Sequence, residues 1–145
     1  ALPISAVENT IRREIERSAM NGVSVRSKDE GVSIILDSLL FQPDSAELVA
    51  GQTGRLNEIA EILSRWPEND VLVTGHTARA GTAAGRDRLS MLRARVVGEY
   101  LVGRGVREPT QILYRGMGAR EPRADNATEE GRRRNRRVEI TILDN

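Results

Sequence analysis

The chain has 145 residues, of which 39% are hydrophobic and 30% charged, and this balance suits one compact domain with a modest core. Its 22 basic and 21 acidic residues leave a net charge of +1, which excludes a strong overall field that would attract nucleic acid or an anionic membrane. The absence of cysteine excludes disulfides, thiolate metal sites and cysteine nucleophiles. No apolar run approaches the ~20 residues that span a bilayer, so we expect a soluble fragment whose export signal or membrane anchor lies outside it.

The first part of the chain predicts a helix followed by a β-hairpin. Between residues 4 and 20, apolar residues recur at steps of three and four, which is typical of a helix with one buried face. Asn21-Gly22 then ends the helix. Residues 23–26 alternate between apolar and polar, and residues 32–36 form a second β-rich run after a polar turn, so the two runs predict a hairpin.

The middle of the chain predicts a helix and a short buried strand. Asp44 or Ser45 is placed to cap a helix whose buried stripe lies within residues 48–63. Trp66-Pro67 ends that helix, because the residue before a proline is pushed out of α geometry. Residues 71–74 follow as a buried strand.

A second long helix and two strands complete the predicted fold. The helix extends from about Asp87 to Gly103. Its expected inward face consists of Leu89, Leu92, Val96, Val97, Tyr100 and Leu101. Residues 112–114 and 138–143 are the last strands, and the polar segment between 120 and 137 is expected to contain one short helix. Strands that alternate with helices predict an α/β (α+β) two-layer sandwich, in which helices cover one face of a mixed sheet.

The residue types that carry chemistry argue against an enzyme. His76 is the one histidine, and no second histidine, cysteine or acidic cluster lies near it in sequence. We therefore interpret His76 as a structural residue at the end of a strand. No phosphate-binding loop, nucleophile elbow or zinc-binding helix motif occurs, so no catalytic residue, metal ion or cofactor is expected.

The run Gly131–Arg137 resembles a nucleic-acid-binding patch in its charge alone. Aromatic residues make up 3% of the chain and none lies within the run, so base stacking has no support. Glu129 and Glu130 precede the run and Glu139 follows it, which supplies local neutralisation. We therefore predict a solvated helix face that leads into a strand, and no nucleic-acid partner.

Several separated segments carry a family resemblance that covers residues 31–142. They are Leu40-Phe41 with Asp44–Leu48, Gly75-His76-Thr77, Leu89-Ser90 with Arg93-Ala94, Gly116-Met117-Gly118, and Asp125–Gly131 leading to Asn135–Ile140. Together these segments resemble the OmpA-like domain, the periplasmic module of outer-membrane protein A, peptidoglycan-associated lipoprotein and the flagellar stator protein MotB. The resemblance implies a βαβαββ core and a noncatalytic fold that grips the stem peptide of peptidoglycan, usually through diaminopimelate.

The resemblance also implies two opposite partners for the zwitterionic end of diaminopimelate. In the family, an aspartate after Gly-His-Thr accepts from the ammonium, and the arginine of the Leu-Ser-x-x-Arg-Ala segment pairs with the carboxylate. Here the arginine is Arg93, but the aspartate position holds Ala78, and Arg86 stands where the family commonly has asparagine. On one helix Arg86, Leu89 and Arg93 would share a face, so we expect a cationic pocket.

These departures predict weak or absent binding of the standard diaminopimelate stem peptide. Losing an acceptor to an ammonium ion costs about 1.5–3 kcal/mol, and a like charge nearby weakens binding further. Asp44 or Asp87 could replace the missing acid, although Asp87 would point away from Arg93. The predicted ligand-binding residues are Thr77, Arg86, Leu89, Arg93, Asn135, Arg136 and Arg137.

Each of these assignments has a plainer alternative. Thr77 donates to a bound peptide or satisfies a loop carbonyl, and Arg93 is a ligand clamp or an ordinary exposed charge. Leu89 lines the groove or belongs to the core. The 135–137 segment contacts the ligand or holds its loop in place.

The leading hypothesis is a periplasmic envelope domain that binds an atypical wall peptide, or binds the wall weakly, and is attached to the outer or inner membrane through another part of the full chain. The first alternative is a scaffold that contacts envelope proteins through the N-terminal helix and hairpin. The second is a stator-like wall-anchoring module. Residues 1–30 are expected to hold the N-terminal helix and first hairpin strand, packed on an OmpA-like domain of residues 31–145.

Overall fold

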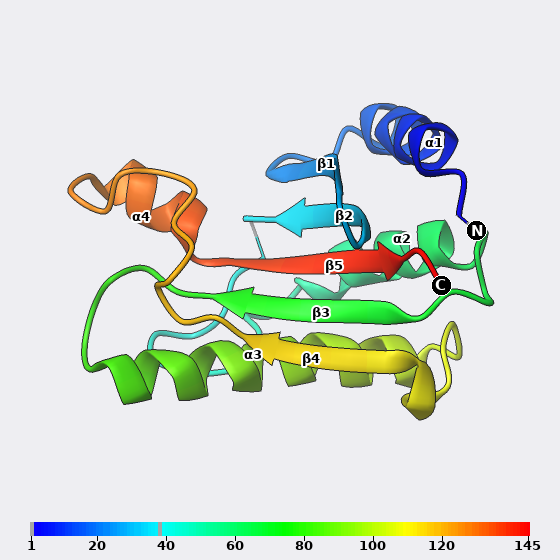
Figure 1. The fold of residues 1–145 in the computed structure, drawn as a ribbon. Helices are drawn as coiled ribbons and strands as arrows, with labels where there is room; N and C mark the ends of the chain where they lie inside the picture. Colours follow the sequence, from blue (N-terminus) through cyan, green and yellow to red (C-terminus); the bar gives the residue numbers. More distant parts are fainter. Residues whose placement is uncertain (1, 38) are drawn as a thin grey trace.

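The computed structural model describes residues 2–37 and 39–145, which form a mixed sheet with helices packed against one of its faces (Figure 1). In chain order the elements are α1 (Ile4–Ser18), β1 (Val23–Lys28), β2 (Gly31–Leu36), α2 (Thr53–Leu63), β3 (Val71–His76), α3 (Ala83–Gly103), the 3-10 helix η1 (Pro109–Gln111), β4 (Ile112–Gly116), α4 (Glu129–Asn135) and β5 (Arg137–Leu143). The strand order is β1-β2-β5-β3-β4, with β3 and β4 parallel and the other neighbouring pairs antiparallel. The predicted α/β (α+β) two-layer sandwich is confirmed.

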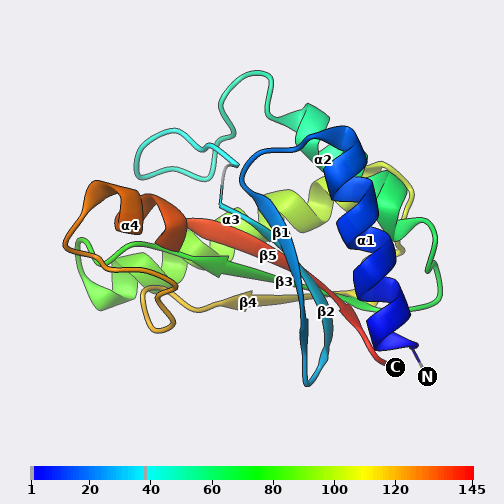
Figure 2. The ribbon, with the colours of Figure 1, turned by 90° about the horizontal axis from the view of Figure 1, so that it is seen from above.

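The hydrophobic core lies between the helices and one face of the sheet. Val138, Ile140 and Ile142 of β5 point into it, because alternate side chains of a strand share one face. Val7 of α1 and Val97 of α3 belong to the same buried cluster, so the N-terminal helix shares its core with the rest of the fold. Figure 2 shows α1 lying beside the β1–β2 hairpin, against which it packs.

The predicted start of the middle helix is wrong, because α2 begins at Thr53. Asp44 adopts a left-handed φ of 51°, and the Ser45 hydroxyl accepts from the Glu47 N–H at 2.9 Å within a local turn. Gly51 has a φ of 88°, which no helical residue adopts. The apolar spacing before Thr53 therefore belongs to a loop and not to a first helical turn.

The predicted start and inward face of α3 also need correction. The helix begins at Ala83, because the Thr82 hydroxyl caps it by accepting from the Gly85 N–H at 3.0 Å. Leu92, predicted to face inward, is 45% exposed. Small residues face the sheet instead, which lets α3 approach the strands closely; they are Ser90, Ala94 and Gly98.

The approach of α3 to β3 gives a testable prediction at Gly75. A Cβ at this position would lie 2.0 Å from the carbonyl oxygen of Ser90. We expect Gly75→Ala to lower the free energy of unfolding by about 3 kcal/mol, because backbone must move to relieve the overlap. In the matched control Gly54→Ala, on α2, the new methyl group meets nothing within 4 Å and should stabilise by about 0.5–1 kcal/mol. Urea denaturation of both variants checks this, and an unchanged midpoint for Gly75→Ala would contradict the close approach.

Candidate functional site

A groove of about 800 Å³ lies at the carboxyl end of β3, next to the start of α3. Its walls come from the loop after β3, the first turns of α3, the segment around Phe41 and the junction between α4 and β5. Figure 1 shows α4, the β3–α3 loop and the start of α3 at the same end of the molecule. Segments that are far apart in sequence thus form one hollow, the kind of place where folds of this class bind ligands.

The groove combines an apolar wall with a strongly cationic one. Leu40, Phe41, Leu89 and Leu92 line the apolar part. The charged lining consists of Arg86, Arg88, Arg93, Arg133, Arg136 and Arg137 against Asp37 and Asp44. Ala78 also lies in the wall and is 6% exposed.

Arg93 fixes one wall of the groove. Its Nε donates to the carbonyl oxygen of Ser45 at 2.8 Å, and Nη2 lies 3.5 Å from that of Gln42. The guanidinium carbon lies 4.8 Å from the centre of the Phe41 ring, within cation–π range. Burial, with the neighbouring charge of Arg136, lowers the pKa of Arg93. At 9% exposure Arg93 is not an ordinary surface charge, and its role as a ligand clamp stays a prediction.

Arg86 also lines the groove, but its side chain braces a loop. Its Nη1 donates to the carbonyl oxygen of Gly81 at 2.8 Å and lies 3.5 Å from that of Ala80. These contacts hold the loop that carries Ala78, while the charge of Arg86 stays at the edge of the groove.

The two aspartates considered as replacements for the missing acid differ in position. Asp87 pairs with Arg120 at 2.5 Å and is not among the groove-lining residues. Asp44 lines the groove, and its charge acts on Arg93, whose pKa it raises against the larger effects of burial and Arg136. No ion pair joins Asp44 to Arg93, so Asp44 lies in the groove as an acid close enough to act on Arg93 without pairing with it.

Asn135 holds the loop before α4 and does not line the groove. The Asn135 side chain is fully buried, and Oδ1 accepts from the backbone N–H groups of Arg123 and Ala124 at 2.7 and 2.9 Å. Its Nδ2 donates to the carbonyl oxygen of Ala124 and to Oδ1 of Asn126, each at 2.9 Å. Asn135 thus supports α4 and, with it, the arginines that α4 brings to the groove.

These bonds predict that Asn135→Ala lowers the free energy of unfolding by about 3 kcal/mol, because two backbone donors lose their acceptor. Glu130→Ala on the exposed side of the same helix is the matched control and should cost less than about 0.5 kcal/mol. Urea denaturation gives both values. Hydrogen exchange should also show faster exchange at residues 123 and 124, and unchanged exchange there would contradict the assignment.

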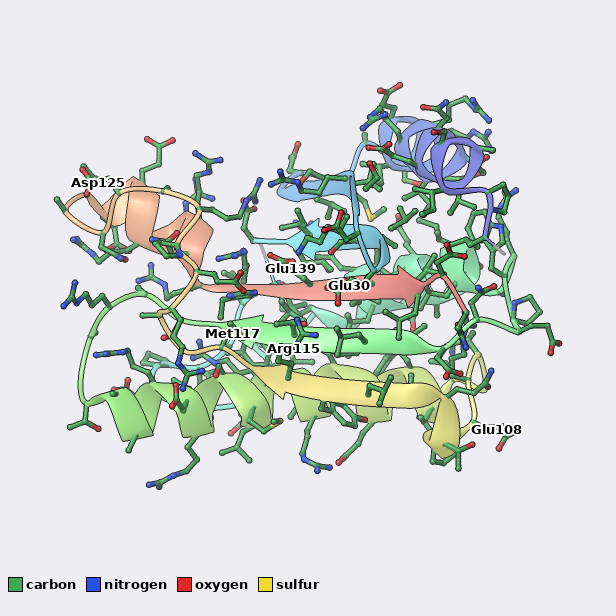
Figure 3. All side chains as sticks on the ribbon, viewed as in Figure 1. Glu30, Glu108, Arg115, Met117, Asp125 and Glu139 are labelled. Carbon is green, nitrogen blue, oxygen red and sulfur yellow. The ribbon has the colours of Figure 1, made fainter. Side chains whose placement is uncertain are left out.

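An ionic cluster lies beside the groove, on the sheet face turned away from α2 and α3. It consists of Lys28, His76, Arg137 and Glu139. Glu139, at its centre, is labelled in Figure 3. Glu139 accepts from Lys28 Nζ at Oε1 and from Arg137 Nε at Oε2, the latter at 2.7 Å. His76 Nε2 lies 3.5 Å from Oε2 of the same carboxylate. Because His76 and Arg137 also line the groove, the cluster connects the binding wall to the hairpin.

The cluster sets the protonation states of its members. Burial alone would raise the pKa of Glu139, but hydrogen bonds from Lys28 and Arg137 lower it to about 2. Burial, followed by the charge of Arg137, lowers the pKa of His76 to about 4, even though Glu139 opposes the shift. At neutral pH Glu139 is therefore ionised and His76 is uncharged.

Two buried polar atoms beside the groove lack a hydrogen-bond partner among the described residues: His76 Nδ1 and Thr77 Oγ1. Their residues are 3% and 7% exposed, and both belong to the groove lining. Buried polar atoms are normally paired, because an unmade hydrogen bond costs about 1–3 kcal/mol. A ligand or an ordered water at the carboxyl end of β3 would therefore supply the partners that these two atoms lack.

Some groove-lining residues are not among the predicted ligand-binding residues. They include His76, which the sequence predicts to be structural, and Arg133, which it places on a solvated helix face. Arg133 lies three residues before Arg136, which directly follows the end of α4, and this spacing could have indicated a shared role. Arg88 gave no comparable signal.

The groove is the candidate ligand-binding site of the described residues. Within residues 2–37 and 39–145, no group of three or more histidine or acidic side chains is placed to hold a metal ion. Among the same residues, no helix has the length and apolar character needed to cross a membrane.

Comparison with known proteins identifies the family. The model of the OmpA family matches residues 40–136, so the chain belongs to the OmpA family. It is 39% identical over 104 residues to the peptidoglycan-binding protein ArfA of Mycobacterium tuberculosis, a match that covers 72% of this chain and 32% of ArfA. The cell wall anchor of the type VI secretion system (T6SS) from Pseudomonas aeruginosa is 31% identical with a TM-score of 0.76, covering 90% of this chain and 94% of that one. A MotB-like protein from Desulfovibrio vulgaris is 26% identical with a TM-score of 0.85, covering 98% and 93%.

Family membership confirms two predictions made from the sequence, the OmpA-like fold and the noncatalytic character of the domain. The chain spans about a third of the length of ArfA, so the comparison concerns one domain of a longer relative.

Proposed function

We propose that this domain is a noncatalytic periplasmic module that associates with peptidoglycan through the groove and binds diaminopimelate stem peptides weakly. The observation that carries the proposal is the composition of the groove, which is lined by Arg93 and by the methyl group of Ala78. The resemblance to the family implies an acid at the position of Ala78. ArfA is named as peptidoglycan-binding and the secretion-system relative as a cell wall anchor, which supports wall association for this chain.

The weak affinity follows from the charges around the ligand end. Arg93 and its neighbours can pair with a carboxylate, but the methyl group of Ala78 cannot accept from an ammonium ion. The loss of one charged acceptor costs about 1.5–3 kcal/mol, which is roughly tenfold to a hundredfold in affinity. Asp37 and Asp44 face six groove arginines, so an ammonium ion in the groove still meets net positive charge.

Co-sedimentation with purified peptidoglycan tests the proposal. The unaltered chain should sediment weakly, and Ala78→Asp should sediment more strongly because it restores the acceptor. Ala78→Asn is the matched control, since it has the same size and no charge, and should not gain as much. No sedimentation of the unaltered chain even at low salt and high wall concentration would contradict wall association.

Arg93→Lys tests the guanidinium group of Arg93, which contacts the groove wall and is predicted to bind the ligand. Lysine keeps the positive charge but loses the planar fork that reaches the Ser45 and Gln42 carbonyl groups. We expect Arg93→Lys to weaken sedimentation further, with circular dichroism confirming that the variant is folded. Sedimentation equal to that of the unaltered chain would contradict a role for Arg93 in binding.

A second candidate function is a stator-like wall-anchoring module, favoured by the likeness to the MotB-like protein over 98% of this chain, which includes the N-terminal helix and hairpin. Such a role predicts self-association through that region. Light scattering across a wide concentration range tests it, and a monomer throughout would count against it. A scaffold for envelope proteins becomes the better account if neither wall binding nor self-association occurs.

A further inference from the structure

The groove carries more positive charge than its own acids neutralise. Arg136 pairs with Glu129, and Arg137 pairs with Glu139. No described acid forms an ion pair with the other four groove arginines, which are Arg86, Arg88, Arg93 and Arg133. Two acids, Asp37 and Asp44, line the groove. Oδ2 of Asp37 lies 3.6 Å from Nη1 of Arg123, and Arg123 is outside the lining. The uncompensated charge of the groove is therefore positive.

The start of α3 adds to this field. Gly81, Thr82 and Gly85 line the groove, so the first turn of the 21-residue helix faces it. The Gly85 N–H already donates to the Thr82 hydroxyl, so the contribution of this helix start is the partial positive charge of its terminus. An anionic group at this end of the groove would meet both the arginines and the helix terminus.

Thr77 adds a second observation at this end of the groove. Its buried hydroxyl has no hydrogen-bond partner among the described residues, and a hydroxyl can donate to an anionic oxygen. Ala78 follows directly in the chain and offers only a methyl group. The carboxyl end of β3 can thus donate to an anion, and it holds no carboxylate to receive an ammonium ion.

We propose that the groove selects a peptide end group that bears a carboxylate and lacks a neighbouring ammonium ion. The inference rests on the proposed function, and it names the ligand class of the same site. Guanidinium groups favour carboxylates through paired N–H donors, whereas an ammonium ion would lie among like charges. The leucines of the opposite wall would pack against the aliphatic part of the same side chain.

Two matched peptides test the selection by calorimetry on the unaltered chain. One is a stem tripeptide that contains meso-diaminopimelate, and the other contains 2-aminopimelate, which keeps the distal carboxylate and lacks the distal ammonium. We expect the aminopimelate peptide to bind at least about tenfold more tightly. Equal affinity, tighter binding of the diaminopimelate peptide, or no binding of either peptide would overturn the proposal.

Variants at Ala78 extend this test to the cause of the selection. Ala78→Asp should reverse the preference toward the diaminopimelate peptide, and Ala78→Asn, which adds an uncharged acceptor, should shift it much less. A preference that survives Ala78→Asp would overturn the charge argument, provided that the variant keeps the circular dichroism spectrum of the unaltered chain.

Variants of α4 test the arginine surplus. Arg133→Gln should lower the affinity for the aminopimelate peptide about threefold or more, because Arg133 lines the groove. It should also reduce the salt dependence of that binding. Arg134→Gln is the matched control on the same helix, outside the lining, and should change neither. Equal effects of the two variants would overturn the role of the groove arginines.

Co-sedimentation with intact wall, measured on the same samples, keeps the two proposals distinguishable. Sedimentation without peptide selectivity would sustain the proposed function and overturn this inference. Peptide selectivity without sedimentation would sustain this inference and contradict wall association.

Discussion

Replacing Glu139 with glutamine should lower the free energy of unfolding by about 3–5 kcal/mol at neutral pH. The carboxylate is almost fully buried and accepts hydrogen bonds from Lys28 and Arg137. Glutamine keeps the shape but leaves the buried guanidinium group of Arg137 without its counter-charge. Because small domains are stable by about 5–15 kcal/mol, this is a large part of the total.

Glu30→Gln is the matched control for Glu139→Gln. Glu30 pairs with Arg115 at 3.4 Å on the same side of the sheet, but both side chains are exposed to solvent (Figure 3). An exposed pair contributes about 0–1 kcal/mol, so the control should change stability little. Urea denaturation at pH 7 measures both variants, and a Glu139→Gln cost below about 1 kcal/mol would show that the ionic cluster is not stabilising.

Acidification from pH 6.5 to pH 4 should destabilise the domain by about 3 kcal/mol through His76 alone. The pKa of His76 falls from its ordinary value of 6.5 to about 4 on folding, because burial and the charge of Arg137 disfavour the imidazolium ion. The unfolded chain therefore takes up a proton that the folded chain does not. The stabilisation is complete above pH 6.5 and is lost as the pH falls toward about 4.

His76→Gln isolates this contribution, because glutamine does not titrate. The difference in unfolding free energy between the two proteins should shrink progressively as the pH is lowered from 6.5 to 4. Glu139 does not affect the result between pH 6.5 and 4.5. Its pKa is about 2 in the folded domain, so its contribution to stability falls only below pH 4.5, where the unfolded chain begins to bind a proton at this residue. A difference that stays constant over the window would mean that His76 titrates normally in the folded domain.

The fold was predictable from the sequence where periodicity and packing agree. The apolar stripe of α1, the hairpin and the buried strand that begins at Val71 all follow the spacing of their hydrophobic residues. The start of α2 was mispredicted because the spacing around Leu48 looked helical, while the left-handed geometry at Asp44 and Gly51 makes this segment a loop. Its apolar character and helical spacing predict that Leu92 faces inward, whereas close packing on the sheet requires smaller residues such as Ala94.

The binding groove was only partly predictable. The family motifs pointed to Thr77, Arg86, Leu89 and Arg93, and the structure places these residues along the groove. Sequence spacing could not show that Arg86 turns back to the Gly81 carbonyl group or that Arg93 supports a loop. Such contacts arise from tertiary packing between segments that no local pattern connects.

We expect envelope ligands to bind at the carboxyl end of β3 and the start of α3. Titration of the isotopically labelled chain with solubilised peptidoglycan fragments, followed by amide chemical shifts, tests this claim most directly. We predict that the largest shifts occur at Thr77, Gly81 and Gly85, which line the groove. Shifts concentrated on α1 and the β1–β2 hairpin, or no shifts at saturating fragment concentrations, would contradict the account.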